Sequence, residues 1–264
     1  MKKAQVITLA NQKGGVGKST TCHIMAYGLY QKGYRVLATD LDPQENLTDT
    51  FLGAEQDEKM KFDFDRRKNI YYIFRKEFTI KDCLIQIEEG LDFVPGSLEL
   101  CGADMEFSGL RREYILRSIL QEVEYDYDYI LIDTPPALGI LTINALTATN
   151  KVVIPVCAKK YSIQGTGWLM NTIKVVQTYN PDLEIAGILI TQYDGRAGIR
   201  KQIQKDLRAQ MEKLQVRVFE NPIRIGCKVE EAQYFSVDLL TSYPNEDITK
   251  DYQKFLEEFL GCER

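Results

Sequence analysis

Short apolar runs alternate with longer segments of mixed polarity along the whole chain. The runs occupy residues 6–10, 35–40, 91–94, 129–133, 151–156, 185–191 and 216–219. Two of them are uniformly aliphatic at their centres, at 130–132 and 152–154, which is typical of strands buried on both faces. Residues 20–32 have the length of a helix and are followed by Gly33, a helix stop signal. This alternation predicts an α/β fold, with a mostly parallel twisted sheet and helices on both faces.

The composition favours a single domain. The chain has 264 residues, 44% of them apolar, and these are spread evenly without a Pro- or Ser-rich linker. We therefore expect residues 1–264 to form one domain, with the charged and weakly patterned stretch 53–68 as a surface excursion. No stretch approaches the roughly 20 apolar residues of a membrane-spanning helix. Six scattered cysteines without a C-x-x-C pair are typical of reduced thiols in a cytosolic protein.

A segment rich in glycine and lysine lies between the first apolar run and the first predicted helix. Glycines in this position let backbone N–H groups approach phosphate oxygens, and a helix N-terminus favours an anion. In such a loop Lys18 would reach the terminal phosphates of a nucleotide, and Ser19 would bind Mg²⁺. The predicted nucleotide-binding residues are Lys13, Gly14, Gly15, Val16, Gly17, Lys18, Ser19 and Thr20.

This loop departs from the usual pattern Gly-x-x-x-x-Gly-Lys-Ser. Gln12 stands where the first glycine is expected, and Lys13 is a second lysine, five residues before Lys18. The loop therefore has one more cation than a single nucleotide site normally needs.

Three aspartates lie at the ends of predicted strands. Asp40 closes the run 35–40, Asp42 follows it by two residues, and Asp133 closes the run 129–133. The carboxyl ends of parallel strands meet at one edge of a sheet, where the glycine-rich loop also lies. We expect Asp40 and Asp42 to face Mg²⁺ and a water molecule, and Asp133 to hold a Mg²⁺-bound water as a Walker-B carboxylate does. A turn or a helix cap is the alternative role for the first pair.

The charge distribution is uneven. The formal net charge is −5, yet residues 196–228 contain nine Lys or Arg against three acids. Within this stretch Arg200, Lys201, Lys205 and Arg208 recur at helical spacing. One helix face therefore has the charge to contact nucleic-acid phosphates without reading bases. An ordinary solvated helix face is the alternative.

Taken in order, these motifs resemble the ParA/Soj family of DNA-partitioning ATPases, a deviant Walker-A group that also contains MinD. The matching segments are 11–13, 40–44, 132–136, 191–196 and 223–232. The resemblance implies ATP and Mg²⁺ as cofactors and an ATPase with weak intrinsic turnover. It also suggests a short form of the family without a separate N-terminal DNA-binding domain, because the loop begins a few residues after Met1.

The resemblance also implies roles for the site residues. Lys13 would reach across to the ATP of a partner subunit in a nucleotide-sandwich homodimer, and Lys18 would contact the phosphates. Asp42 would position or activate the attacking water. Mg²⁺ would be supported by Ser19, Asp40 and Asp133. One departure is Glu45, where relatives often carry a small residue, and this leaves the rate of hydrolysis open.

Partners follow from the same resemblance. Non-specific double-stranded DNA would be contacted by Arg196, Arg200, Arg224 and Lys228, and a ParB-like protein would stimulate hydrolysis. The protein would be cytoplasmic and nucleoid-associated, without a membrane partner, while its cargo stays open among chromosome, plasmid and integrative element. A MinD-like membrane ATPase is the alternative function. The acids among residues 248–264 make that segment a poor anchor for an anionic bilayer.

Overall fold

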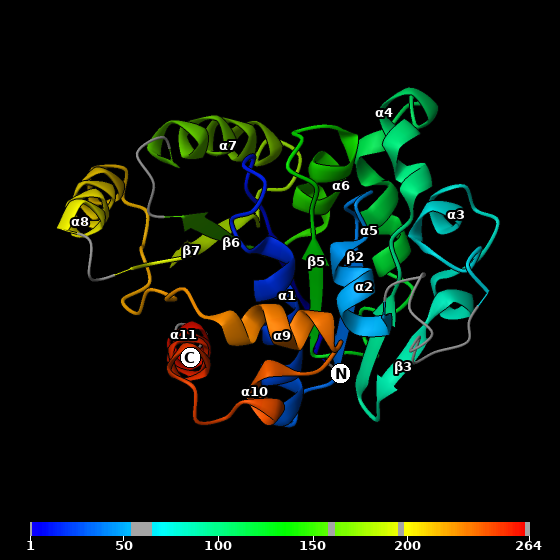
Figure 1. Cartoon of the computed structure of the whole chain (residues 1–264). Helices are drawn as coiled ribbons and strands as arrows, with labels where there is room; N and C mark the ends of the chain where they lie inside the picture. The colour runs from blue at the N-terminus through cyan, green and yellow to red at the C-terminus, as the bar shows by residue number, and fades with distance from the viewer. Residues whose placement is uncertain (1, 54–64, 158–161, 195–197, 262–264) are drawn as a thin grey trace.

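The computed structural model describes residues 2–53, 65–157, 162–194 and 198–261, without the side chains of 162–166, 199 and 200. Within these ranges seven strands form one sheet in the order β3-β4-β2-β5-β1-β6-β7 (Figure 1). The strands are β1 (Gln5–Leu9), β2 (Val36–Asp40), β3 (Ile85–Glu88), β4 (Leu91–Val94), β5 (Tyr129–Asp133), β6 (Lys151–Cys157) and β7 (Glu184–Thr191). Only the β3–β4 pair of this sheet is antiparallel. The predicted α/β fold is confirmed.

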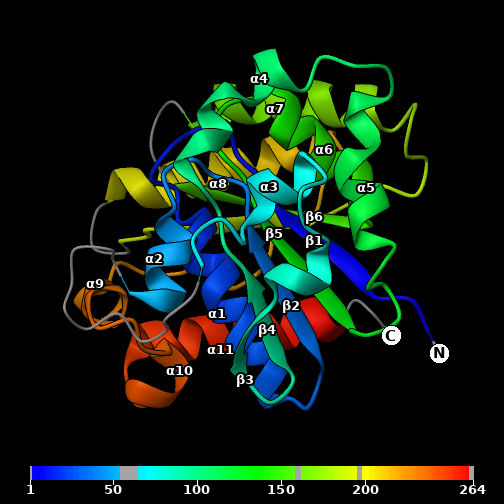
Figure 2. The ribbon, with the colours of Figure 1, turned by 90° about the vertical axis from the view of Figure 1, so that its right-hand side faces the viewer.

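Helices cover both faces of this sheet. The α-helices are α1 (Lys18–Gln31), α2 (Asn46–Leu52), α3 (Ile70–Phe74), α4 (Ala103–Glu106), α5 (Ile115–Leu120), α6 (Ile140–Ala148), α7 (Ser162–Val176), α8 (Gly198–Lys213), α9 (Cys227–Tyr234), α10 (Leu239–Ser242) and α11 (Asp247–Gly261). Short 3-10 helices are η1 (Ile80–Cys83), η2 (Leu98–Gly102) and η3 (Arg112–Tyr114). Figure 2 shows α2 and α9 on one side of the strands and α5 on the other.

The strands are buried on both faces because successive side chains point to opposite sides. Leu131 packs in one core cluster with residues of α1, α2 and α11, whereas its neighbours Ile130 and Ile132 pack in a second with α3, α5 and α6. A third cluster joins Val152 and Ile154 to α7 and α8. Uniformly aliphatic strand centres are therefore explained by two apolar faces.

Most predicted elements agree with the structure within two residues at each end. The predicted strand at 216–219 is wrong, because this segment makes only a single bridge, between Ile188 and Val218. The antiparallel edge strand β3 was not predicted, since its alternation of half-buried and exposed residues gives a weak signal. Most of the proposed excursion at 53–68 lies outside the described residues.

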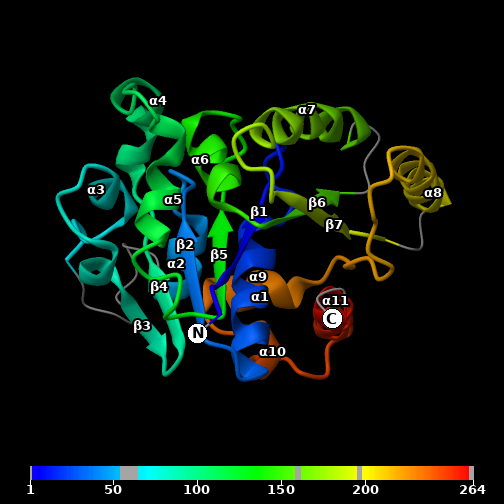
Figure 3. The same ribbon diagram turned by 180° about the vertical axis from the view of Figure 1, so that it is seen from behind.

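The sheet register brings the predicted site residues to one edge. Leu9, the last residue of β1, is paired with Asp133 on β5, and Asp133 is paired with Asp40 on β2. The loop before α1 and the segments after β2 and β5 therefore leave the sheet side by side. Figures 1 and 3 place α4 and α7 toward this end of the molecule, opposite the N-terminus.

Candidate nucleotide site

The glycine-rich loop joins β1 to α1 in the conformation that a bound anion requires. Gly15 and Gly17 have left-handed φ angles of 67° and 86°, which glycine adopts without steric cost. Gly17 occupies the N-cap position of α1, so the N–H groups of the first helical turn face the loop. The first turn contains no acidic residue to compete with an anion. Backbone N–H groups and the helix dipole therefore favour phosphate at this position.

The last residue of β7, Thr191, and the residue after it, Gln192, hold the loop by hydrogen bonds. The Thr191 hydroxyl donates to the Val16 carbonyl at 2.8 Å, and the Gln192 side-chain amide donates to the Gly15 carbonyl at 2.7 Å. Both loop carbonyls are thereby turned toward β7, away from a bound anion. Gln192 has a left-handed φ of 51°, an unusual backbone state for a residue with a side chain.

Asn11 fixes the beginning of the loop. Its side-chain oxygen accepts the Lys13 backbone N–H at 2.9 Å, and its side-chain nitrogen donates to the Pro155 carbonyl at 2.6 Å. Sequence reasoning assigned no role to Asn11, Thr191 or Gln192, although all three lie in the segments that carry the family resemblance. Except for the local bond from Lys13 to Asn11, their partners lie far away in the sequence and cannot be read from a local pattern.

Lys18 is buried at the base of the site, among carboxylates. Burial lowers its pKa, while Asp133 and Asp42 act in the opposite direction. Lys18 is 6% exposed and lines the cavity in which a phosphate would lie. A buried cation is costly unless it is paired, so this lysine is prepared for an anionic ligand.

Asp40 shapes the segment that follows β2. Its two carboxylate oxygens accept the Asp42 N–H at 2.9 Å, the Thr48 N–H at 3.0 Å and the Thr48 hydroxyl at 2.9 Å. Complete burial and the nearby Asp133 raise its pKa well above the usual value, against these hydrogen bonds. Asp40 therefore positions Asp42 and the start of α2, and its role toward Mg²⁺ stays a prediction.

Asp42 lines the nucleotide cavity. Its side chain accepts the Gln44 N–H at 3.1 Å, which fixes the carboxylate, and burial raises its pKa. Its backbone carbonyl accepts the Glu45 N–H at 3.0 Å, and Glu45 has a left-handed φ of 55° before α2 begins. The tight turn at Glu45 therefore holds Asp42 at the cavity wall, and its role toward the attacking water stays a prediction.

The Asp133 carboxylate can accept hydrogen bonds that the described part of the chain does not provide. Both of its carboxylate oxygens are buried without a hydrogen-bond partner there, and burial raises its pKa despite the nearby Ser19 and Lys18. Ser19 stands at the start of α1, facing this carboxylate. A hydrated Mg²⁺ fits such a pair, because its water ligands would satisfy the Asp133 oxygens while the Ser19 hydroxyl binds the ion.

A cavity of about 540 Å³ opens above these residues. It is lined by Gly14, Gly15, Gly17, Lys18, Ser19, Thr20, Asp42, Gln44, Asn46, Asp49, Thr50, Pro136, Gln233, Tyr234 and Ser236. The far wall comes from α9, where Gln233 donates to the Thr20 hydroxyl at 3.0 Å. Sequence reasoning did not anticipate this contribution from α9. Lys13 is half-buried beside the loop, and its cross-subunit role stays a prediction.

The predicted DNA-contacting residues have different surroundings. Arg196 lies outside the described residues, and Arg200 belongs to α8 but its side chain is not described. Arg224 donates to Asp251 at 2.7 and 3.0 Å and to Asp247 at 2.7 Å. It therefore ties the segment before α9 to the C-terminal helix, in addition to any contact with DNA.

Lys228 is also engaged with other side chains. Its ammonium group lies 2.7 Å from Glu231 and 5.1 Å from the centre of the Tyr243 ring. Lys201 and Lys205, by contrast, are exposed along α8. The local excess of positive charge that the sequence indicates is therefore presented mainly by α8, and its DNA role stays a prediction.

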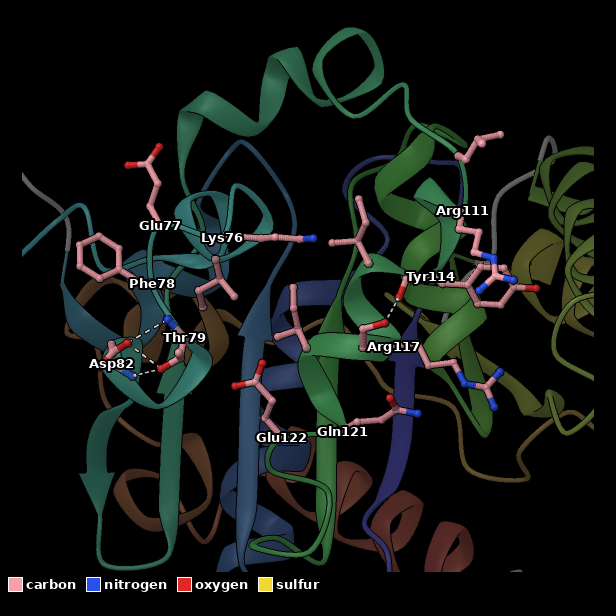
Figure 4. Close-up of a pocket in the computed structure, with 15 residues that line it drawn as sticks. Lys76, Glu77, Phe78, Thr79, Asp82, Arg111, Tyr114, Arg117, Gln121 and Glu122 are labelled. Carbon is pink, nitrogen blue, oxygen red and sulfur yellow. Dashed lines mark hydrogen bonds between the residues drawn. The ribbon is translucent and has the colours of Figure 1, made fainter.

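A second, larger cavity lies on the flank formed by α3, η1 and α5, with a volume of about 1040 Å³. In Figure 4, Lys76 reaches across it from one wall, while Arg111, Tyr114 and Arg117 come from the other. The dashed lines between Thr79 and Asp82 mark the capping box that closes the first turn of η1, and the one beside Tyr114 marks the bond from the Ser118 hydroxyl to the Tyr114 carbonyl. None of its lining residues belongs to the nucleotide cavity.

The C-terminal helix α11 is amphipathic, and its apolar face is used within the protein. Tyr252, Phe255, Leu256 and Phe259 are all buried in the core cluster beside α1. Among the described residues, no helix is long and apolar enough to cross a membrane. The apolar face of α11 is thus occupied by intramolecular packing.

The fold and the site define the class of protein. A loop with left-handed glycines, a buried lysine and a strand-terminal aspartate together form the nucleotide site of a phosphate-loop protein. A family model described as an AAA domain matches residues 4–185. The chain is 35% identical to the chromosome partitioning protein ParA of Caulobacter vibrioides over 265 residues, covering 98% of this chain and 95% of that protein. It belongs to the ParA/Soj family of partitioning ATPases.

Other relatives support the same placement. The sporulation initiation inhibitor protein Soj of Bacillus subtilis is 40% identical over 207 residues, covering 77% of this chain and 79% of that protein. Among solved structures, a plasmid partition protein of Borrelia burgdorferi B31 bound to AMPPNP is 30% identical, with a TM-score of 0.81 and coverage of 99% and 100%.

A further solved structure carries both predicted cofactor types. A cobyrinic acid a,c-diamide synthase of Mycobacterium smegmatis with bound ADP and magnesium is also 30% identical, with a TM-score of 0.80 and coverage of 97% and 94%. These bound ligands agree with the predicted cofactors, ATP and Mg²⁺.

Proposed function

We propose that this protein is a Mg²⁺-dependent ATPase that partitions DNA, with weak turnover on its own. ATP binding brings two copies together, the dimer binds double-stranded DNA non-specifically at the nucleoid, and hydrolysis, stimulated by a ParB-like partner, releases it. The observation that carries this proposal is the buried group of Lys18, Asp42 and Asp133 beneath a phosphate loop that also contains Lys13. The family membership supports the same conclusion.

Each residue of the site has a role in this proposal that follows from its position. Lys18 and the loop N–H groups hold the phosphates, and the Thr191 and Gln192 bonds keep the loop carbonyls turned away from them. Bound Mg²⁺, held by Ser19 with Asp133 behind its waters, would neutralise charge on the terminal phosphates. Asp42 accepts a hydrogen bond from the attacking water, and its raised pKa suits it to hold a proton.

Lys13 couples ATP binding to dimerisation in this proposal. The cavity already contains Lys18, so a second lysine adds most when it neutralises the γ-phosphate of the opposite subunit. Closure of two subunits is then favoured only when ATP is bound. The burial of the apolar face of α11 in the core speaks against the MinD-like alternative, because a bilayer would have to compete with that packing.

The test is Lys13→Ala, with Lys32→Ala at the exposed end of α1 as a matched loss of charge. Lys13→Ala should retain monomeric ATP binding within a few-fold yet form no ATP-dependent dimer, as measured by light scattering with a slowly hydrolysed ATP analogue. Lys32→Ala should dimerise as the unmodified protein does. Normal dimers in Lys13→Ala would refute the cross-subunit role.

A further inference from the structure

A carboxylate on α4 caps the helix that follows the strand of Asp133. Asp104 accepts the backbone N–H of Ile140, the first residue of α6, at 2.7 Å. The segment 134–139 thus runs between two fixed points, Asp133 at the end of β5 and the capped start of α6. Pro136, within this segment, lines the nucleotide cavity. A shift at the start of α6 would therefore move the cavity wall.

Gly139 provides the space that this contact needs. A Cβ atom at this position would lie 2.5 Å from one Asp104 oxygen and 3.0 Å from the other. The φ of Gly139 is −88°, a value that any residue adopts, so glycine is required here for close approach and not for backbone conformation. The side chain of residue 139 cannot cap its own helix, and Asp104 takes that role from a different element.

Hydrogen bonds from two threonines also hold this segment, one from the residue after β5 and one from α6. The Thr134 hydroxyl donates to the Leu9 carbonyl at 2.8 Å, and the Thr142 hydroxyl donates to the Ala137 carbonyl at 2.6 Å. Asp104 differs because α4 is a separate surface element that carries the exposed Met105. Its hydrogen bond links α4 directly to the first residue of α6, beside the apolar packing of Ala103 against the same helix.

We propose that Asp104 is a positioning residue for nucleotide hydrolysis, acting through the capped start of α6 on the segment 134–139. The inference rests on the proposed ATPase function. Asp104 does not line the nucleotide cavity, and Pro136 is the residue of the segment that does, whereas the phosphate-binding residues come from the loop before α1; the rate of hydrolysis should therefore change more than the binding of ATP. If the whole cost of losing a helix cap appeared as a higher barrier to hydrolysis, kcat would fall about three- to tenfold, which sets the upper limit of the expected effect.

The test uses Asp104→Ala, Asp104→Asn and Gly139→Ala. Asp104→Ala and Gly139→Ala should each lower kcat and leave KM for MgATP and the affinity for a fluorescent ATP analogue unchanged. Asp104→Asn keeps an oxygen acceptor and should restore most of the rate. The double variant Gly139→Ala/Asp104→Ala should be no slower than either single variant, because the added methyl group then meets no carboxylate.

A matched control lies on the same helix. Glu106→Gln removes one negative charge from α4, while its contacts are with Tyr71 and Arg75 and not with α6. It should leave kcat unchanged. Additive losses in the double variant, an unchanged kcat in Asp104→Ala, or an equal loss in Glu106→Gln would overturn the proposal.

Hydrogen exchange separates this inference from the proposed function. In the nucleotide-free protein, the amide of Ile140 should exchange faster in Asp104→Ala and at the original rate in Asp104→Asn. If the unmodified protein hydrolyses no ATP, the proposed function fails, and a faster Ile140 amide in Asp104→Ala still supports the cap. Unchanged exchange in a folded Asp104→Ala variant overturns it.

Discussion

The contact between Thr191 and Val16 offers the sharpest test of how the phosphate loop is held. Thr191→Val removes the hydroxyl that donates to the Val16 carbonyl at 2.8 Å and replaces it with a methyl group of similar size. Thr191 is buried, and its existing methyl group lies near Gly17, so the packing should be retained. The substitution therefore removes this hydrogen bond, together with the longer contact of the same hydroxyl with the Cys157 sulfur at 3.8 Å.

The expected magnitude follows from the acceptor that is left behind. A buried carbonyl without a partner costs about 1–3 kcal/mol. If the Val16 carbonyl stays in place, this cost appears as lower stability, at about 2–4 °C in Tm per kcal/mol for a chain of this size. If the carbonyl turns toward water, the loop moves and ATP binds more weakly, by tenfold for each ~1.4 kcal/mol. The two effects together should amount to about 1–3 kcal/mol.

Thermal melting without nucleotide and titration with a fluorescent ATP analogue measure the two parts. Thr147→Val is the matched control, because the Thr147 hydroxyl is buried without a hydrogen-bond partner among the described residues. Its replacement should be neutral or stabilising, since no bond is lost and a buried polar group is removed. The reasoning fails if Thr191→Val changes neither quantity, or if Thr147→Val destabilises the protein as much.

Three further predictions concern charge. Burial raises the pKa of Asp133 above its unfolded value, so the folded state binds a proton more tightly and stability without Mg²⁺ should fall as pH rises toward the raised pKa, by up to ~1.4 kcal/mol per pH unit. Asp133→Asn should flatten this dependence, and an unchanged slope in thermal melts from about pH 4.5 to 8 would contradict the prediction. Arg224→Ala removes the guanidinium donors to Asp251, which keeps only the backbone N–H of residue 224 as a donor from this position. The variant should cost about 1–2 kcal/mol after allowing for solvent screening, and an unchanged Tm would exclude the structural role. The double variant Lys201→Ala/Lys205→Ala should weaken binding to unrelated DNA sequences equally and reduce the slope of log K against log salt concentration by up to ~0.9 per lost phosphate contact. Unchanged binding at matched salt would mean that α8 presents an ordinary solvated face.

The placement of the candidate nucleotide-site residues was largely predictable from the sequence because its signals are local. A short apolar run, a glycine-rich turn and a helix follow one another directly, and strand-terminal positions specify where Asp40 and Asp133 lie. Their grouping follows from the rule that parallel strands end at one edge of the sheet. What the sequence does not show is how each carboxylate is used. The donors from Thr48 to Asp40, for example, depend on the turn at Glu45.

The charged segment was less predictable because charge does not reveal its partners. Arg224 and Lys228 count as surplus cations in the sequence, yet Asp247, Asp251 and Glu231 neutralise them in the fold. The first two of these acids lie more than 20 residues away, on a different helix. The strand predicted at 216–219 failed for a related reason, since an apolar run forms a strand only where a neighbouring edge accepts it over several residues.

The bonds from Thr191 and Gln192 to the phosphate loop also determine when the site can form during synthesis. The loop lies within the first 20 residues, but its partners follow 175 and 177 residues later. A chain emerging from the ribosome at about 5–20 residues per second completes β7 roughly 10–35 seconds after the loop. The nascent protein should therefore reach its full affinity for nucleotide only when most of the sheet has formed. ATP then stabilises complete chains in preference to incomplete ones.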